Sequence, residues 1–115
     1  KEGKKIVKII NSFLMINCQL SQLDEELLNF ANKNNLKKNI FKEFKSIQNL
    51  KKLNQEVKFI TNFGREMEYY TGIVFEILSG KKDIARGGRY DNLLKSLGAK
   101  KNIPAVGAAI NLNNI

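Results

Sequence analysis

Histidine is absent from this sequence of 115 residues, and cysteine occurs only once. Without histidine the chain has no serine–histidine or cysteine–histidine pair for nucleophilic catalysis, no imidazole general base and no imidazole metal ligand. Because Cys18 is alone, a disulfide bond within the chain is impossible, and nothing indicates an oxidising compartment. These two absences exclude several large classes of enzyme and of secreted protein.

Long hydrophobic runs are also missing. No apolar stretch approaches the ~20 residues that a helix needs to span a bilayer. The start of the chain is basic and then apolar, but it lacks a long apolar core and a small-residue cleavage site, so we predict no signal peptide. We therefore expect a cytoplasmic protein with no membrane partner.

Acidic residues are scarce relative to basic ones, since 20 Lys and Arg stand against 11 Asp and Glu and give a net charge of +9. Such a charge can attract a polyanion, but a composition rich in Lys, Asn and Ile also produces it without any binding role. The sequence contains no block of about five or six like charges, so we do not expect nucleic acid as a partner. The content of 43% hydrophobic and 27% charged residues indicates a globular chain.

Apolar residues recur at helical spacing through the first half of the chain and predict three helices. We expect these helices over about 6–14, 21–33 and 36–52. Ser21 followed by Asp24 resembles a capping box and would begin the second helix. We interpret the apolar stripes of these helices as core-facing, with no visible function of their own.

The second half of the chain has the alternating, β-branched pattern of strands. Strands are predicted over 57–63 and 101–110, and a hairpin over 69–89 turns at Gly80, which can adopt a positive φ. Between the hairpin and the last strand we predict a short helix that ends at Gly98. Helices followed by antiparallel strands indicate an α+β fold.

This pattern divides the chain into two segments of one domain. We expect 1–115 to form a single domain, with a helical segment over 1–55 and antiparallel strands with a short helix over 56–115. The two segments differ in texture because helices and strands bury apolar residues at different periods.

The long strand of the hairpin has two different faces. Ile73, Phe75 and Ile77 share an apolar face that we expect in the core. The other face carries Tyr70 and Glu76, with a glycine between them. That face is either the floor of a ligand pocket or an ordinary solvent-facing surface in which the glycine marks a bulge.

The segment RGGRYD, residues 86–91, is a sharper signal. Two successive glycines allow a flat ligand to lie against the backbone, or allow a turn with positive φ. Arg86 and Arg89 flank the glycines, and arginine suits bidentate binding of carboxylate or phosphate. The segment is therefore either an anion site or a hairpin end with surface arginines.

No acid–base pair or metal site is visible. The acidic residues of the second half contain no two whose spacing indicates a division of catalytic labour, and no carboxylate triad suits a metal. These residues are Glu66, Glu68, Glu76, Asp83 and Asp91. We therefore predict no catalytic residue, no metal and no cofactor.

Three segments of the second half follow one another in a recognisable order. They read REMEYYTGIVFE, ARGGRYDNLLKSLG and IPAVGAAINLNNI. Together they resemble the C-terminal half of the catalytic domain of histidyl-tRNA synthetases, which carry an Arg-Gly-Leu-Asp-Tyr-Tyr loop, a Val-Phe-Glu strand and a Gly-Gly-Arg-Tyr-Asp turn. The resemblance covers about residues 64–115. It implies part of a class II aminoacyl-tRNA synthetase-like domain, an antiparallel sheet with flanking helices.

The sequence departs from the synthetase pattern in two motifs. Synthetases carry in the last motif an arginine that contacts the ATP phosphates; here the matching residue is Asn114, and Asn111 and Asn113 replace the glycine and glutamate before it. Asparagine cannot supply a permanent positive charge to a triphosphate. In the first motif Glu66 replaces the glycine, whereas Glu68 keeps the acid.

An amino-acid pocket that is kept while the nucleotide side is lost resembles the noncatalytic branch of this family, the regulatory subunits of ATP phosphoribosyltransferase. The resemblance implies a chain without catalysis of its own that acts in histidine biosynthesis. Its implied partner is the short-form ATP phosphoribosyltransferase catalytic subunit, which it would activate while contributing to histidine feedback. It also implies a homo-oligomer, formed through the N-terminal half of the family domain that this sequence lacks.

The resemblance also implies a pocket for histidine or a similar ligand. An amino acid needs an acid for its ammonium group and polar or cationic groups elsewhere, and the residues of the three motifs supply both kinds. The pocket residues implied are Arg65, Glu68, Tyr69, Tyr70, Gly87, Gly88 and Arg89.

Two alternatives lead to different expectations. A fragment of a catalytic histidyl-tRNA synthetase, which aminoacylates tRNA with ATP, predicts an arginine at the position of Asn114 and an anticodon-binding domain after Ile115. A synthetase-like regulator that senses uncharged tRNA predicts salt-dependent binding of tRNA.

Overall fold

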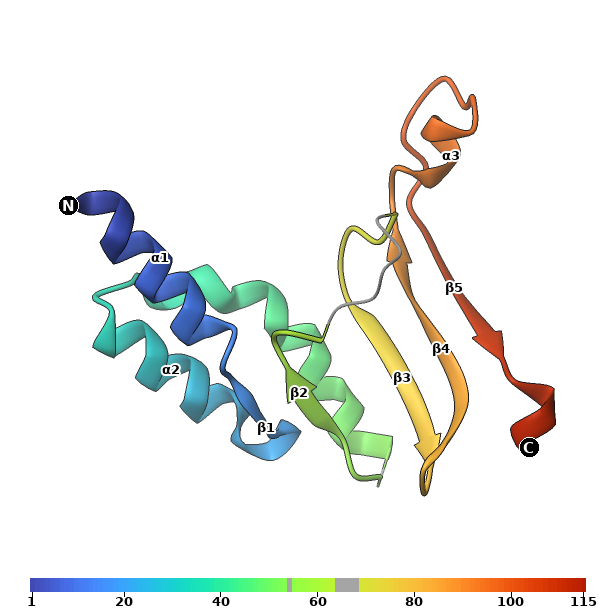
Figure 1. Cartoon of the computed structure of the whole chain (residues 1–115), viewed down its shortest axis with the longest axis horizontal. Helices are drawn as coiled ribbons and strands as arrows, with labels where there is room; N and C mark the ends of the chain where they lie inside the picture. Colours follow the sequence, from blue (N-terminus) through green and yellow to red (C-terminus); the bar gives the residue numbers. More distant parts are fainter. Residues whose placement is uncertain (54, 64–68) are drawn as a thin grey trace. The chain divides into compact units, whose positions relative to one another are not determined.

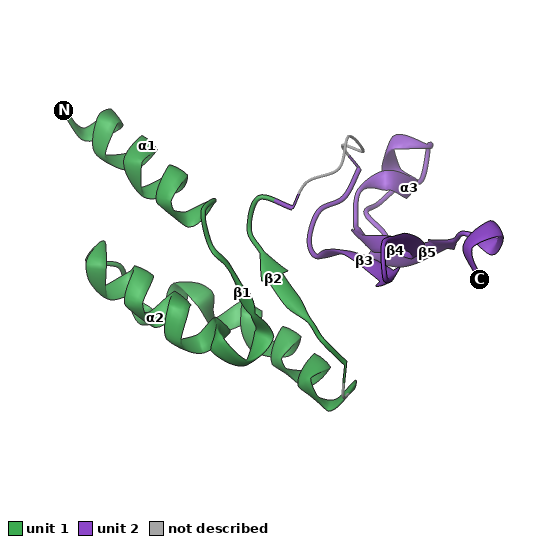
Figure 2. Ribbon diagram, turned by 60° about the horizontal axis from the view of Figure 1, so that its bottom comes forward, with its two compact units in different colours: residues 1–62 green, residues 63–115 purple. Residues whose placement is uncertain are grey.

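The computed structural model describes residues 1–53, 55–63 and 69–115 (Figure 1). The chain divides into two compact units, Lys1–Asn62 and Phe63–Ile115 (Figure 2). The first unit holds the helical half of the chain and a two-stranded sheet, and the second holds a three-stranded sheet. Helices together with antiparallel sheets confirm the predicted α+β class.

Two α-helices of the first unit follow the predicted stripes. α1 spans Glu2–Phe13, and α2 spans Leu23–Lys33 with three acidic residues in its first turn. Acids at that end stabilise a helix because its N-terminus carries a partial positive charge. α1 has no buried residue, whereas α2 buries three. α2 is therefore the helix around which the first unit packs.

The start of α2 differs from the prediction. A 3₁₀ turn, η1 (Leu20–Gln22), leads directly into the helix, and the N-cap residue Gln22 makes no side-chain capping hydrogen bond. The capping box predicted at Ser21 is therefore wrong. Leu20 is only 3% exposed, so its burial in the core anchors this end of the helix in place of a cap.

The end of α2 is closed by an asparagine in the left-handed region. Asn35 has a φ of 54°, and its N–H donates to the carbonyl of Asn32 at 3.3 Å. The next N–H, of Leu36, donates to the carbonyl of Ala31 at 2.8 Å. These two bonds form a Schellman motif, in which asparagine takes the place usually held by glycine.

The third helical segment, η2 (Lys38–Leu53), confirms the predicted helix but winds as a 3₁₀ helix. A 3₁₀ helix has three residues per turn, so side chains three apart fall on one line. The apolar residues of this segment keep that spacing from Phe41 to Leu53, with Ile47 buried among them. Ile40 lies off this line and is 56% exposed.

The core of the first unit lies between the helices and a short antiparallel pair, β1 (Asn17–Gln19) and β2 (Lys58–Ile60). Buried aliphatic side chains form its centre, and a connected row of phenylalanine rings surrounds them. The central residues are Ile16, Leu20, Leu23, Leu27 and Ile47. Such a core is held together by apolar side chains removed from water.

The second unit is an antiparallel meander (Figure 1). Its strands β3 (Val74–Ser79), β4 (Lys82–Tyr90) and β5 (Ala105–Ile110) pair in that order. Gly80 is the first residue of the two-residue β3–β4 turn and has a φ of 59°, a position that favours glycine. The predicted hairpin and last strand are thereby confirmed, although β3 begins later than expected.

A short helix, α3 (Leu93–Ser96), connects β4 to β5. Gly98 closes it with a φ of 105°, and the next residue, Ala99, donates to the carbonyl of Leu94 at 2.9 Å. The predicted glycine cap is confirmed. A second short 3₁₀ turn, η3 (Leu112–Asn114), follows β5.

The apolar face of the sheet is not covered by the described residues of the second unit. Ile73, Phe75 and Ile77, expected in the core, are 50%, 39% and 52% exposed. On the same face of β5, on the other side of β4, Val106 and Ile110 are 77% and 61% exposed. The expectation of burial is therefore not met by this unit alone, because three strands provide no second layer. None of the helices in the described parts of the chain is both long and apolar enough to cross a membrane.

Candidate ligand site at the tyrosine cluster

Three tyrosine rings gather at one end of the sheet in the second unit. The ring centroids of Tyr69 and Tyr70 lie 4.6 Å apart, and Tyr90 lies 5.7 Å from Tyr69 with the ring planes at 90°. Tyr69 and Tyr70 precede β3, whereas Tyr90 ends β4. We call these three residues the tyrosine cluster. Each ring carries an apolar face and a hydroxyl, so the cluster can offer both kinds of contact to a ligand.

Two glycines lie beneath the tyrosine cluster. Gly88 and Gly107 are directly paired on β4 and β5. A Cβ atom at Gly88 would lie 2.8 Å from two ring carbons of Tyr70, and one at Gly107 would lie 2.6 Å from the hydroxyl oxygen of Tyr90. Glycine is therefore required for the tyrosines to rest on the backbone. The flat group that lies on Gly88 is the ring of Tyr70. A ligand on this face of the sheet would therefore contact the tyrosine rings before the glycine backbone.

Gly87 serves the opposite face of the sheet. A Cβ atom there would lie 2.2 Å from the carbonyl oxygen of Gly107 and 2.9 Å from the Phe75 ring. The absence of a side chain thus allows β4 and β5 to approach, with Phe75 folded over the strand. The two adjacent glycines have different roles. Gly88 leaves space for the ring of Tyr70, and Gly87 leaves space for β5 to approach β4.

Arg89 is engaged by the residues around it. Its Nε donates to both carboxylate oxygens of Asp91, at 2.9 and 3.1 Å. The N–H of Asp91 donates to Oγ1 of Thr71 at 2.9 Å, and the N–H of Thr71 donates to the carbonyl of Arg89 at 3.0 Å. The aliphatic stem of Arg89 lies over Gly72, where an added Cβ atom would meet Cδ of Arg89 at 3.4 Å, an ordinary van der Waals distance. The arginine stem therefore occupies the space over Gly72 without requiring a glycine there.

The other arginine of the motif is also paired. Arg86 forms an ion pair with Asp83 and stands opposite Glu76, a half-buried residue of β3. The backbone carbonyl of Asp83 accepts a hydrogen bond of 2.8 Å from Nδ2 of Asn114. Pairing with carboxylates weakens the attraction of both arginines for an anionic ligand. Asn114 uses its amide to fix the segment after β5 to the start of β4.

The hydroxyl group of Tyr69 keeps its proton at physiological pH. A hydrogen bond with the Tyr70 side chain, together with partial burial and the charges of Tyr70 and Tyr90, raises the pKa of Tyr69 above its ordinary value of 10.0. The site therefore offers hydroxyl donors and acceptors instead of a fixed charge. In the described ranges no group of three or more histidine, cysteine or carboxylate side chains could hold a metal.

The sequence of both units matches a known family. The family model described as histidyl-tRNA synthetase matches residues 2–115. This chain belongs to the histidyl-tRNA synthetase family. Membership covers the helical unit as well, in which no diagnostic motif was visible in the sequence.

Several curated relatives within the histidyl-tRNA synthetase family bear one name, ATP phosphoribosyltransferase regulatory subunit. The relative from Agrobacterium fabrum is 36% identical over 94% of this chain and 31% of its own length. That from Sinorhizobium fredii is 36% identical over 93% of this chain and 30% of its own length. The relative from Mesorhizobium japonicum is 48% identical over 53% of this chain and 17% of its own length. The chain thus spans less than a third of the length of these relatives.

The pocket residues predicted from the histidyl-tRNA synthetase pattern do not all lie in one place. Tyr69, Tyr70 and Gly88 come together in the tyrosine cluster and its floor, whereas Gly87 and the stem of Arg89 contact other groups. Arg65 and Glu68 lie outside the described residues.

The sequence interpretation missed Tyr90 as a site residue. It stands in the Gly-Gly-Arg-Tyr-Asp turn of the histidyl-tRNA synthetase pattern, two residues after Gly88. Strand alternation places residues two apart on one face, and this signal could have identified it.

Proposed function

We propose that this chain is part of a noncatalytic regulatory subunit of ATP phosphoribosyltransferase, built on a class II synthetase-like domain that includes both units. Such a subunit would act at the first step of histidine biosynthesis, where it activates the short-form catalytic subunit and contributes to feedback by histidine. The names of the curated relatives support this proposal.

The observation that carries the proposal is the role of Asn114. In the synthetase pattern an arginine at this position contacts the ATP phosphates. Here a neutral amide occupies the position, and it donates to the carbonyl of Asp83 at 2.8 Å. Neutral donors bound to backbone cannot replace a cation that stabilises charge on a triphosphate. The arginines of β4, Arg86 and Arg89, are paired with aspartates. The site is therefore suited to binding without adenylate formation.

We further propose that the tyrosine cluster forms one wall of a histidine pocket. Its hydroxyls and ring faces suit an imidazole, which is flat and can both donate and accept a hydrogen bond. The set proposed for the pocket is Arg65, Glu68, Tyr69, Tyr70, Gly87, Gly88 and Arg89, in which Glu68 would receive the ammonium group. Gly88 acts by letting Tyr70 rest on the sheet, and Arg89 acts by holding the segment at Thr71 through Asp91.

Regulation through such a pocket would work by linkage. A ligand that binds one assembly state of the complex more tightly than another shifts the equilibrium between them by its difference in affinity. Histidine bound at the tyrosine cluster would thus change the activity of a partner subunit without any chemistry at its own site.

The first experiment separates a regulatory subunit from a synthetase. The intact protein is tested for ATP–pyrophosphate exchange in the presence of histidine, and we expect no exchange above background. Robust exchange would mean that the protein is a histidyl-tRNA synthetase. The variant Asn114→Arg serves as a control, because restoring the cation alone should not create activity while Arg86 and Arg89 remain paired.

The second experiment tests the partner. The intact protein is added to a short-form ATP phosphoribosyltransferase catalytic subunit, and we expect turnover to rise and then to fall when histidine is added. Tyr70→Ala should weaken the histidine effect by about tenfold or more, since ring contacts supply much of the binding energy. Unchanged turnover on addition of the intact protein would contradict the proposal.

A further inference from the structure

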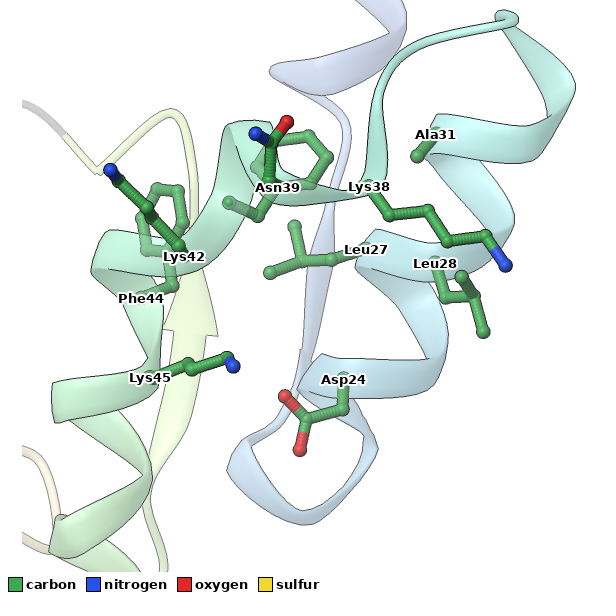
Figure 3. A pocket seen from close by; sticks show the side chains of 10 residues that line it. Asp24, Leu27, Leu28, Ala31, Lys38, Asn39, Lys42, Phe44 and Lys45 are labelled. Atoms are coloured by element: carbon green, nitrogen blue, oxygen red, sulfur yellow. The ribbon is translucent and has the colours of Figure 1, made fainter.

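A groove runs between α2 and η2 in the first unit (Figure 3). It encloses about 420 Å³ and lies far from the tyrosine cluster in the sequence. Its floor is apolar: Leu27 and Ala31 are buried at 5% and 0% exposure, and Leu28 and Phe44 lie beside them. Its rim is basic, because η2 contributes Lys38, Lys42 and Lys45. Among the described residues that line the groove, Asp24 is the one with an acidic side chain.

The 3₁₀ winding of η2 explains why floor and rim alternate. With three residues per turn, Phe41 and Phe44 fall on one line of the helix and point to the core. Lys42 and Lys45 follow them by one residue, so they form a parallel line at the edge of the groove. Figure 3 shows the Lys45 side chain directed toward Asp24 on α2, across the groove.

The chemistry of the groove favours a protein segment over a small molecule. Pockets for small ligands carry a few buried polar groups that fix the orientation of the ligand. Here the buried lining residues, Leu27 and Ala31, are apolar, and the polar ones are exposed at the rim. An apolar trough edged by lysines matches an amphipathic segment that carries leucine-like side chains on one face and carboxylates beside them.

Nucleic acid fits the groove less well. Binding of single strands relies on aromatic faces on which bases can stack. Phe41 stacks on Phe13 with ring planes 7° apart, and Phe44 meets Phe59 edge to face at 5.4 Å. These rings are therefore committed to the core of the first unit.

We propose that the α2–η2 groove docks an acidic amphipathic segment of a partner protein. Apolar side chains of that segment bind over Leu27, Leu28 and Ala31, and its carboxylates face the lysine rim. Charge complementarity supports this occupant, because three lysines of the lining stand against one aspartate. The proposal does not depend on the tyrosine cluster or on the function proposed for it.

The test uses a synthetic helical peptide with leucine at one face and glutamate at the flanks, about four turns long. Its binding to the intact protein is measured by fluorescence anisotropy, and the binding surface by NMR chemical shifts. We expect binding that weakens with salt, with the shifts centred on Leu28 and the lysine rim. A peptide in which lysine replaces glutamate, and one in which serine replaces leucine, should not bind.

A matched pair of variants locates the site. Lys42→Glu with Lys45→Glu reverses the rim, and we expect affinity for the peptide to fall about tenfold or more. Lys51→Glu with Lys52→Glu makes the same charge change further along η2, outside the groove lining, and affinity should stay within about twofold because distant exposed charges are screened. Circular dichroism of both variants checks that the helices persist.

Three outcomes would overturn the proposal. The first is absence of peptide binding to the intact protein, which would mean that the groove is closed in the whole molecule. The second is equal loss of affinity in the two double variants, which would mean that net charge alone attracts the peptide. The third is tRNA that binds the intact protein and loses affinity only in the rim variant, which would make the lysine rim a nucleic-acid surface.

Discussion

The interiors of the two units of this chain are packed in opposite ways. In the first unit, buried side chains such as Leu23, which is fully buried, fill the space between helices and strands. In the second unit the most buried positions of β4 include Gly87 and Gly88, which lie close to backbone atoms and to the rings of Phe75 and Tyr70. One unit therefore depends on side chains that are present, and the other on side chains that are absent.

This difference indicates which unit can present a ligand site. A core of interlocked side chains is costly to alter, because any change of volume leaves a cavity or a clash. Glycines in a sheet instead leave space on its surface for other side chains. Here the tyrosine cluster occupies that space over Gly88 and Gly107. The second unit is accordingly the one that presents a candidate ligand site on its sheet.

The largest effect should come from removing a side chain in the first unit. Leu23→Ala leaves a cavity at a residue with 0% exposure, and we expect the free energy of unfolding to fall by about 2–5 kcal/mol. Urea unfolding of the intact protein, monitored by a probe in the first unit, measures it. Leu28→Ala on the same helix, at 42% exposure, is the control and should cost less than about 1 kcal/mol.

The complementary experiment adds a side chain in the second unit. Gly87→Ala places a Cβ atom 2.2 Å from the carbonyl oxygen of Gly107, so β4 and β5 must separate. We expect destabilisation of about 1–3 kcal/mol, with faster amide exchange in β5. Gly72→Ala is the matched control, since its Cβ would meet the Arg89 stem at an ordinary 3.4 Å. Equal effects of the two substitutions would contradict the role given to glycine.

The sequence predicted the structure well at positions where one residue type strongly favours one backbone conformation. Gly80 and Gly98 were predicted at positive φ, and both have it, because glycine adopts that region without a steric cost. The apolar stripes predicted the helices for a similar reason, because a helix in a protein gains most of its stability by burying one apolar face. Asn35 performs the same task as Gly98 but was not predicted, because asparagine is also common in ordinary loops.

Features that depend on distant contacts could not be predicted. The capping box at Ser21 failed because the burial of Leu20, a tertiary effect, decides how α2 begins. The hydrogen bond from Asn114 to Asp83 joins residues 31 positions apart, and nothing in the sequence near either residue indicates it. For the candidate site, the motifs named most of the residues, but only the structure shows that Tyr70 rests on Gly88 and that Gly87 lets β5 approach β4.

A smaller effect tests the asparagine that closes α2. Asn35→Ala places a residue that tolerates the left-handed region less well than asparagine at φ 54°, and we expect a loss of about 1–2 kcal/mol. Asn35→Gly should be neutral or slightly stabilising, since glycine favours this position. Urea unfolding of both variants of the intact protein decides the matter. A loss in Asn35→Gly as large as in Asn35→Ala would mean that the side chain, and not the backbone, is important.

The smallest effect concerns protonation in the second unit. The pKa of Tyr69 is raised above 10.0, first by the hydrogen bond with Tyr70, so the folded protein holds this proton more tightly than the unfolded chain. The resulting stabilisation is complete below the unfolded pKa and disappears as the pH rises through the folded one. Tyr70→Phe should lower the pKa of Tyr69 toward 10.0, as measured by NMR titration of the ring carbons. Tyr90→Phe removes only the weakest contribution and should shift it less. If both variants shift the pKa equally, the hydrogen bond with Tyr70 does not dominate, and the tyrosine cluster acts as an electrostatic unit.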